Sequence, residues 1–151
     1  MSENNKLRLY LDNCAYNRPY DDQSQLRISL ESQAKLYIQE KIKEGKFELV
    51  CSYMSIYECS MNPYTMRKNS IMDFMENNTD IFVSDEYKID IEKCAANIMN
   101  TGIKFKDACH VASAIFAKCD YFISPDKRLL KYHSDDIVLL SPVDFITIDG
   151  V

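Results

Sequence analysis

Short apolar runs alternate with longer amphipathic segments along this chain. The short runs lack helical spacing and are typical of buried strands. They cover residues 6–11, 47–51, 81–83, 121–124 and 137–140. In the longer segments apolar residues recur every three or four positions, which predicts helices. These segments cover residues 24–44, 52–61, 64–77, 85–99, 106–118 and, as a short helix, 127–132. We expect a loop over 13–22 and an edge strand or a tail over 145–148.

The order of these segments predicts the fold class. Strands that alternate with helices form right-handed β–α–β units, so the strands run parallel and helices cover both faces. A chain of 151 residues is long enough to bury one hydrophobic core. We therefore predict an α/β fold in one domain over residues 1–151, with a central, mostly parallel sheet of four to five strands.

Four acidic residues lie at the ends of, or just after, the apolar segments. Asp12 ends the first strand, Glu58 lies in the helix after the second, Asp107 opens a late helix, and Asp126 follows the fourth strand. The carboxyl ends of parallel strands converge on one crevice. Carboxylates gathered there repel one another, and a hard cation such as Mg²⁺ relieves that repulsion. The pattern favours a metal-dependent phosphodiesterase, in which metal-bound water attacks phosphorus.

Each acid also has a structural interpretation. Asp12 could form a turn or cap a helix, and Asp126 in Ser-Pro-Asp is a natural helix cap. Asp107 suits the dipole at the start of its helix, and Glu58 could face solvent. Asp120 precedes the fourth strand, so we expect it at the opposite end from Asp126, in a structural role.

Three polar neighbours could support the acids. Asn13 could orient Asp12 by hydrogen bonding or simply close the turn. Ser124 could hydrogen-bond a carboxylate or a phosphate oxygen. His110 lies one turn after Asp107, where it could act as a general acid or a metal ligand, although a hydrogen bond to a ligand is favoured.

The net charge of −5 argues weakly against a nucleic-acid-binding protein, because such proteins are usually basic. A cluster of catalytic acids accounts for part of this charge, and a bound metal would offset it locally. Basic residues flank the acids near Asp107 and Asp126, where they could bind phosphates or form a solvated rim. These residues are Lys104, Lys106, Lys127 and Arg128.

The cysteines and the first residues bear on the cellular setting. Six cysteines contain no C-x-x-C pair and are accompanied by only two histidines, which favours buried free thiols over disulfides or zinc. No apolar run approaches the ~20 residues of a membrane helix, and the first residues carry no apolar signal segment. We expect a cytoplasmic protein without a membrane partner.

Four segments together carry a family resemblance. They are Leu9-Tyr10-Leu11-Asp12-Asn13, Ser55-Ile56-Tyr57-Glu58, Lys106 through Ala114, and Cys119 through Asp126. Over nearly the whole chain, the sequence resembles the PIN-domain nucleases. The resemblance implies a three-layer α/β/α domain and Mg²⁺- or Mn²⁺-dependent cleavage, usually of single-stranded or structured RNA. It also implies that Asp12, Glu58, Asp107 and Asp126 are the family's acids, with Ser124 where members have Thr or Ser.

The sequence also departs from the family pattern. Asp12-Asn13-Cys14 stands where many members have Asp-Thr/Ser-Asn, so the asparagine comes one position early. The segment Arg18 through Asp22 and the long helix after it differ from the compact, VapC-like toxin members.

We therefore expect a metal-dependent endoribonuclease that hydrolyses RNA. This function could be that of a toxin with an antitoxin partner. The protein could also form a homodimer. A non-catalytic PIN-fold module that binds RNA or a protein is the alternative. A phosphatase is a third interpretation, but such enzymes commonly use an Asp-x-Asp motif that the first strand lacks.

Overall fold

Five parallel strands form the centre of the computed structural model, which describes residues 6–149. The strand order is β3-β2-β1-β4-β5, and every neighbouring pair is parallel. The strands are β1 (Leu7–Leu11), β2 (Phe47–Ser52), β3 (Ile81–Val83), β4 (Tyr121–Ile123) and β5 (Val138–Leu140). This arrangement confirms the predicted α/β class and the parallel sheet.

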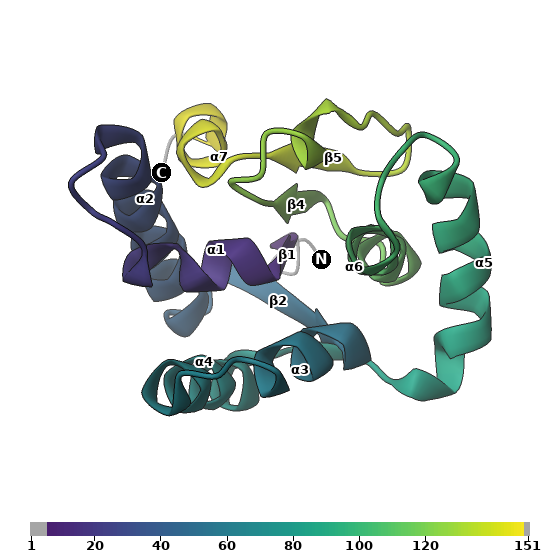
Figure 1. The fold of residues 1–151 in the computed structure, drawn as a ribbon, viewed down its shortest axis with the longest axis horizontal. Helices are drawn as coiled ribbons and strands as arrows, with labels where there is room; N and C mark the ends of the chain where they lie inside the picture. Colours follow the sequence, from purple (N-terminus) through teal and green to yellow (C-terminus); the bar gives the residue numbers. More distant parts are fainter. Residues whose placement is uncertain (1–5, 150–151) are drawn as a thin grey trace.

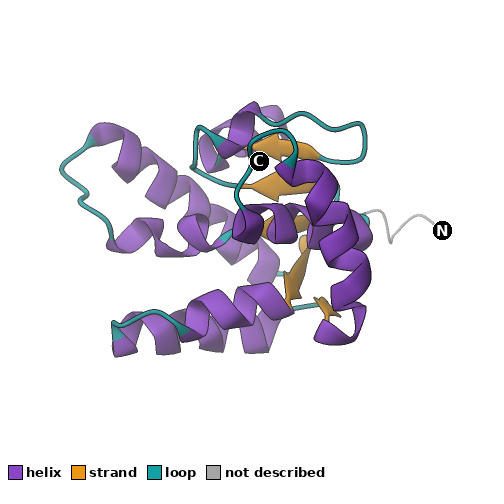
Figure 2. Cartoon of the chain, turned by 45° about the vertical axis from the view of Figure 1, so that its right-hand side comes forward, coloured by secondary structure: helices purple, strands orange, loops and turns teal. Residues whose placement is uncertain are grey.

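Helices cover both faces of the sheet, as the two views in Figures 1 and 2 show. The α-helices are α1 (Asn13–Asn17), α2 (Leu26–Lys43), α3 (Tyr53–Ser60), α4 (Thr65–Asn78), α5 (Lys88–Met99), α6 (Phe105–Phe116) and α7 (Pro142–Asp149). Short 3₁₀ turns are η2 (Arg18–Tyr20), η3 (Asp85–Tyr87) and η4 (Leu129–Lys131). Helices α5 and α6 contribute to the core on one face, whereas α1, α2, α4 and α7 contribute to the other.

The alternation of side chains along the strands explains this two-sided core. Leu9 and Leu11 of β1 point into the cluster that α2 and α7 cover, whereas Tyr10 points into the cluster under α5 and α6. All three side chains are at most 1% exposed. Strands that are buried on both faces read as continuous apolar runs, which is why periodicity identified them in the sequence.

Helix α6 packs closely on the sheet because its buried positions are small. Ala108, Ala112 and Ala114 are at most 1% exposed and carry a single methyl group each. This packing brings the first turn of α6, with Asp107, to the ends of the strands.

Three predictions from the sequence were wrong. Residues 13–22, expected as a loop, contain α1 and η2, which together cover residues 13–20. Helix α1 is only five residues long, too short for periodicity to reveal, and it begins because the Asp12 carboxylate accepts a hydrogen bond from the Ala15 N–H at 3.0 Å. The short helix expected over 127–132 is limited to η4.

The segment 145–148 is part of helix α7 rather than an edge strand or a tail. Its β-branched residues favour a strand locally, but the Ser141 hydroxyl accepts the Asp144 N–H at 3.0 Å and starts a helix. The Phe145 ring is fully buried at 5.4 Å and 5.3 Å, between ring centroids, from Phe47 and Tyr121. Burial on the sheet therefore overrides the local preference.

The strand order creates a crevice between β1 and β4. The chain leaves β1 toward β2 on one side and leaves β4 toward β5 on the other, so the connections diverge at this point. Ligands of open α/β sheets bind outside the carboxyl ends of strands at such a switch. Asp12 and Ser124 follow these two strands directly, and the Asp12 N–H donates to the Ile123 carbonyl at 3.1 Å.

Candidate active site

Asp12 is buried at the switch point, with 3% of its surface exposed. Burial raises its pKa from 3.8 to about 6, and the charge of Asp107 acts in the same direction. Hydrogen bonds from Ser124 and the Ala15 N–H, together with His110, act to lower it. Because an ionised carboxylate is disfavoured here, this position favours a proton or a cation.

The raised pKa of Asp12 predicts how stability varies with pH. The folded-state pKa lies above the unfolded-state pKa, so ionisation of Asp12 opposes folding. The opposing contribution is absent below about pH 4, grows between about pH 4 and 6, and is complete above that range. A pKa near 6 rather than 3.8 lowers the free energy of unfolding above pH 6 by at most about 3 kcal/mol.

We therefore expect metal-free Asp12→Asn to be more stable than the wild type at about pH 7.5, by at most about 3 kcal/mol, with the difference vanishing near pH 4. Asparagine also caps helices well, so the Ala15 hydrogen bond can persist. Urea unfolding in EDTA at both pH values measures the difference. A difference of the same size at both would show that ionisation of Asp12 is not the cause.

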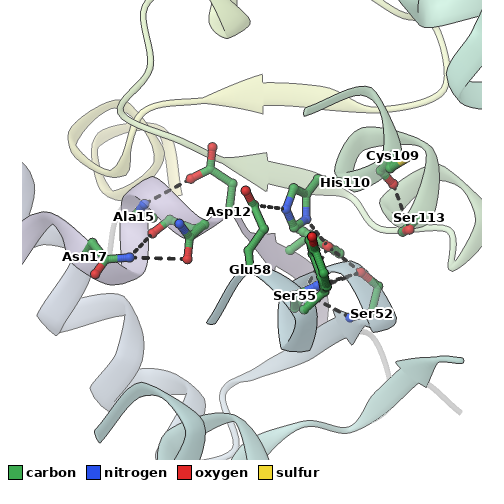
Figure 3. A network of polar contacts seen from close by, with 12 residues as sticks. Asp12, Ala15, Asn17, Ser52, Ser55, Glu58, Cys109, His110 and Ser113 are labelled. Carbon is green, nitrogen blue, oxygen red and sulfur yellow. Dashed lines mark hydrogen bonds and ion pairs between the residues drawn. The ribbon is translucent and has the colours of Figure 1, made fainter. Parts of the chain in front are cut away.

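Glu58 is held by a buried chain of hydrogen bonds (Figure 3). Its Oε1 lies 2.5 Å from His110 Nε2, and His110 Nδ1 lies 2.5 Å from Tyr10 Oη. Tyr10 Oη is in turn 2.7 Å from Ser52 Oγ and 3.0 Å from Ser55 Oγ. In Figure 3 the Glu58 carboxylate points toward the His110 ring, with Asp12 on the other side of Glu58.

The direction of these hydrogen bonds follows from counting protons. The Oγ atoms of Ser52 and Ser55 accept each other's backbone N–H at the start of α3, so each hydroxyl keeps its own proton to donate. Tyr10 keeps its proton because burial raises its pKa well above 10. Every group in this chain has a hydrogen-bond partner when both serines donate to Tyr10 Oη, Tyr10 donates to His110 Nδ1, and His110 Nε2–H donates to Glu58.

The partial burial of Glu58 acts to raise its pKa, but the hydrogen bond from His110 and the charge of Lys106 bring the pKa below its ordinary value. Glu58 therefore stays ionised. The sequence analysis named His110 but missed Tyr10, Ser52 and Ser55. The Ser52-x-x-Ser55 spacing before an apolar run is a capping-box pattern that could have marked the two serines.

Asp107 and Asp126 line one cavity together. Burial raises the pKa of Asp107, and the charges of Asp126 and Glu58 raise it further. Asp126 accepts hydrogen bonds from the N–H groups of Arg128 at 2.9 Å and Leu129 at 3.4 Å, and so stabilises the turn that leads into η4, whose N-cap is Arg128. Ser124 Oγ accepts the Asp126 N–H at 3.0 Å.

The Cys14 thiol is affected by the charges of all four acids. The side chain of Cys14 is exposed, but it lies beside the crevice, where partial desolvation raises its pKa to about 12. The carboxylates that raise this pKa further are Asp12, Asp126, Asp107 and Glu58, in that order. Of the four acids, Asp107 and Asp126 line one cavity together, and Asp126 also lines the second cavity with Cys14. Sequence analysis treated Cys14 only as one of six thiols.

The acids converge without forming a closed ligand set. Across residues 6–149, no three side chains of His, Cys, Asp or Glu are close enough together to hold a metal ion. The donor chemistry nevertheless fits a hard cation, because all four acids offer oxygen atoms and two of them have raised pKa values. The predicted supporting residue Asn13 is hydrogen-bonded to Asn17, whose Nδ2 donates to the Asn13 carbonyl at 3.0 Å. Among the described residues, Asn13 makes no hydrogen bond to Asp12.

The predicted basic residues lie around this crevice. Lys104 and Arg128 line a cavity of about 510 Å³ together with Asp107 and Asp126. Lys127 lines a second cavity of about 450 Å³ that also reaches Asp126. The Lys106 ammonium lies 5.6 Å from the centre of the Tyr57 ring.

Comparison with solved structures identifies the fold. The chain is similar to structures titled VapBC2 from Rickettsia felis bound to a DNA fragment from its promoter (11% identity, TM-score 0.54), FitAcB from Neisseria gonorrhoeae (16%, 0.53) and FitAB bound to an IR36 DNA fragment (16%, 0.56). Each match covers 89% of this chain and 98%, 97% and 95%, respectively, of the other chain. No family model and no curated protein matches the sequence.

VapBC and FitAB are toxin–antitoxin complexes whose VapC or FitB component is a PIN domain. The protein therefore has a PIN-like fold, as the sequence motifs predicted. Within the described part of the chain, the helices are all too short or too polar to cross a membrane.

Proposed function

We propose that this protein is a metal-dependent endoribonuclease that hydrolyses RNA phosphodiester bonds, and that it acts as the toxin of a toxin–antitoxin pair. The observation that carries the proposal is the position of the four acids relative to the parallel sheet: Asp12 follows β1, Glu58 lies in the helix after β2, Asp107 lies in the first turn of α6, and Asp126 follows β4 and lines one cavity with Asp107. The PIN-like fold and the toxin–antitoxin complexes among the similar structures support the same class.

The residues that would hold the cation are Asp12, Glu58, Asp107 and Asp126. Carboxylate oxygens suit Mg²⁺ or Mn²⁺. When bound, such an ion activates a water molecule and stabilises the charge on the phosphate and the leaving oxygen. The raised pKa values of Asp12 and Asp107 in the metal-free protein are consistent with a site that favours a cation.

The chain's own residues orient the site. His110 holds Glu58 through Nε2–H, and the Tyr10 hydroxyl fixes the His110 ring from the other side. Ser124 supports Asp12, whose carboxylate also caps α1. Lys104, Lys106, Lys127 and Arg128 would position the phosphate backbone of the RNA.

Cleavage of labelled single-stranded RNA tests this proposal. Cleavage should require Mg²⁺ or Mn²⁺ and stop with EDTA. Rescue of growth arrest by a neighbouring gene product, whose protein co-purifies with this chain, tests the toxin role. Absence of cleavage with either metal across a panel of single-stranded and structured RNA would reject the nuclease.

A second candidate is a non-catalytic module with the same fold that binds RNA or a protein. It is favoured by the lack of a closed ligand set across the described residues and by the net charge of −5. This candidate predicts that Mn²⁺ does not bind at millimolar concentrations.

A further inference from the structure

Asp126 lines two cavities. The larger, of about 510 Å³, lies between the turn that joins α5 to α6 and the η4 turn, and its walls include Gly102, Lys104, Arg128 and Lys131. The smaller, of about 450 Å³, lies against α1 and the start of α2 and includes Arg18 and Arg27. A strand that crosses the acids could extend into either cavity.

The arginines of the smaller cavity are already paired. Arg18 Nε lies 3.0 Å from Glu31 Oε1, and its Nη1 lies 3.0 Å from Asp21 Oδ2. Arg27 Nε lies 3.4 Å from the second oxygen of Glu31 and its Nη2 donates to the Pro125 carbonyl. Glu31 is 5% exposed, so its carboxylate is shielded from solvent, whereas the Arg27 side chain is about half exposed. The paired carboxylates offset the positive charge of these arginines and so weaken their attraction for a phosphate.

The cations of the larger cavity have no such partners. Between residues 6 and 149, no carboxylate lies within ion-pair distance of Lys104, Arg128 or Lys131. All three side chains are exposed. The cavity therefore combines three cations that are not held in ion pairs with two of the acids, Asp107 and Asp126.

The wall of the larger cavity is open at Gly102. This residue has φ of +102°, a conformation that side chains other than glycine rarely adopt. A Cβ atom built there would meet nothing within 4 Å. Tyr132 lines the same cavity and supplies an aromatic ring, and single-strand sites commonly combine such rings with positive charge.

Building on the proposed function, we propose that the larger cavity binds the sugar–phosphate backbone of single-stranded RNA on one side of the cleaved bond, through Lys104, Arg128 and Lys131. The smaller cavity contacts the backbone less extensively, because Glu31 and Asp21 neutralise its arginines and leave Lys127 as its one basic residue outside these ion pairs. The protein therefore holds its substrate asymmetrically across the acids.

The salt dependence of RNA binding tests this proposal. For single strands, the logarithm of the affinity falls with the logarithm of salt concentration with a slope of about −0.7 for each phosphate contacted. Lys104→Gln, Arg128→Gln and Lys131→Gln should each make the slope shallower by about 0.7. Anisotropy of a labelled single-stranded RNA, with Ca²⁺ in place of Mg²⁺ or Mn²⁺ and with the strand shown to remain intact, measures it.

Two variants with the same change of charge are the controls. Arg27→Gln removes a paired arginine from the smaller cavity, and Lys93→Gln removes an exposed lysine that lines neither cavity. Both should leave the slope unchanged. Equal changes in all five variants, unchanged slopes in the three cavity variants, or no binding by the wild type would overturn the proposal. Equal competition by polyglutamate would point to a protein partner and would also overturn it.

Cleavage in Mn²⁺, followed in parallel, separates this proposal from the proposed function. Altered slopes without cleavage by the wild type would reject the nuclease and retain the strand-binding cavity. Cleavage with unaltered slopes would retain the nuclease and reject the cavity as the strand site.

Discussion

Asp107→Asn should lower the rate of RNA cleavage by at least about 10²- to 10³-fold while leaving the folded protein intact. The substitution keeps the shape of the side chain but removes one charge that a divalent cation needs. Loss of one group that stabilises the charge of a transition state commonly has an effect of this size. Single-turnover cleavage of labelled single-stranded RNA in Mn²⁺ measures the rate.

The stability of the same variant distinguishes a lost function from a lost fold. Burial and the nearby charges of Asp126 and Glu58 raise the pKa of Asp107, so its ionised form is disfavoured in the metal-free fold. Removing that charge should leave stability unchanged or increase it, although the interaction with the α6 dipole is lost. Urea unfolding in EDTA provides this measurement.

Asp120→Asn is the matched control. Asp120 lies at the opposite end of β4 from Asp126, where its carboxylate accepts the Arg8 N–H at 2.8 Å. This confirms the structural position expected from the sequence. The control should retain full cleavage. Full activity in Asp107→Asn, or an equal loss in Asp120→Asn, would contradict the assignment of Asp107 to the catalytic site.

Tyr10→Phe should destabilise the protein by about 4 kcal/mol. The ring can keep its stacked contact with Phe122, whose centroid is 5.3 Å away. The lost hydroxyl, however, leaves Ser52, Ser55 and His110 Nδ1 without their shared partner. A buried polar group without a partner costs about 1–3 kcal/mol, as expected for His110 Nδ1, and the loss of one hydrogen bond by each serine adds about 1 kcal/mol apiece. The midpoint and slope of urea unfolding measure the change.

Tyr16→Phe provides the comparison for Tyr10→Phe. Tyr16 is also buried, with 3% exposure, but its hydroxyl contacts only the Cys51 sulfur at 3.7 Å within the described residues. Its loss should cost less than about 1 kcal/mol. Equal destabilisation by the two substitutions would show that the hydrogen-bond chain to Glu58 does not contribute as described.

The sequence predicted the fold where local pattern and tertiary packing agree. The central strands β2, β1 and β4 are apolar because helices bury both of their faces, so the lack of helical spacing identified them. Helix α7 was missed because its start depends on the Ser141 cap and its burial depends on rings from β2 and β4, which are distant in sequence. Helix α1 was missed because one capping carboxylate, Asp12, determines its start.

The candidate site was predictable only in part. The four acids could be placed at the ends of strands and helices, so the topology predicted that they lie near one edge of the sheet. The support for Glu58 could not be predicted, because Tyr10 reads as an ordinary core aromatic and meets His110 only through folding. The pairing of Arg18 and Arg27 with a buried Glu31 likewise depends on how η2 packs against α2.

Calorimetric titration with Mn²⁺ tests most directly whether the four carboxylates form a cation site. The wild-type protein should bind Mn²⁺ at millimolar concentration or below, and saturation at about one hundred times the dissociation constant should stabilise the fold by about 2.7 kcal/mol. Asp12→Asn should lose most of this binding, whereas Asp120→Asn should retain it. No binding by the wild type at millimolar Mn²⁺, or equal binding by Asp12→Asn, would contradict the account.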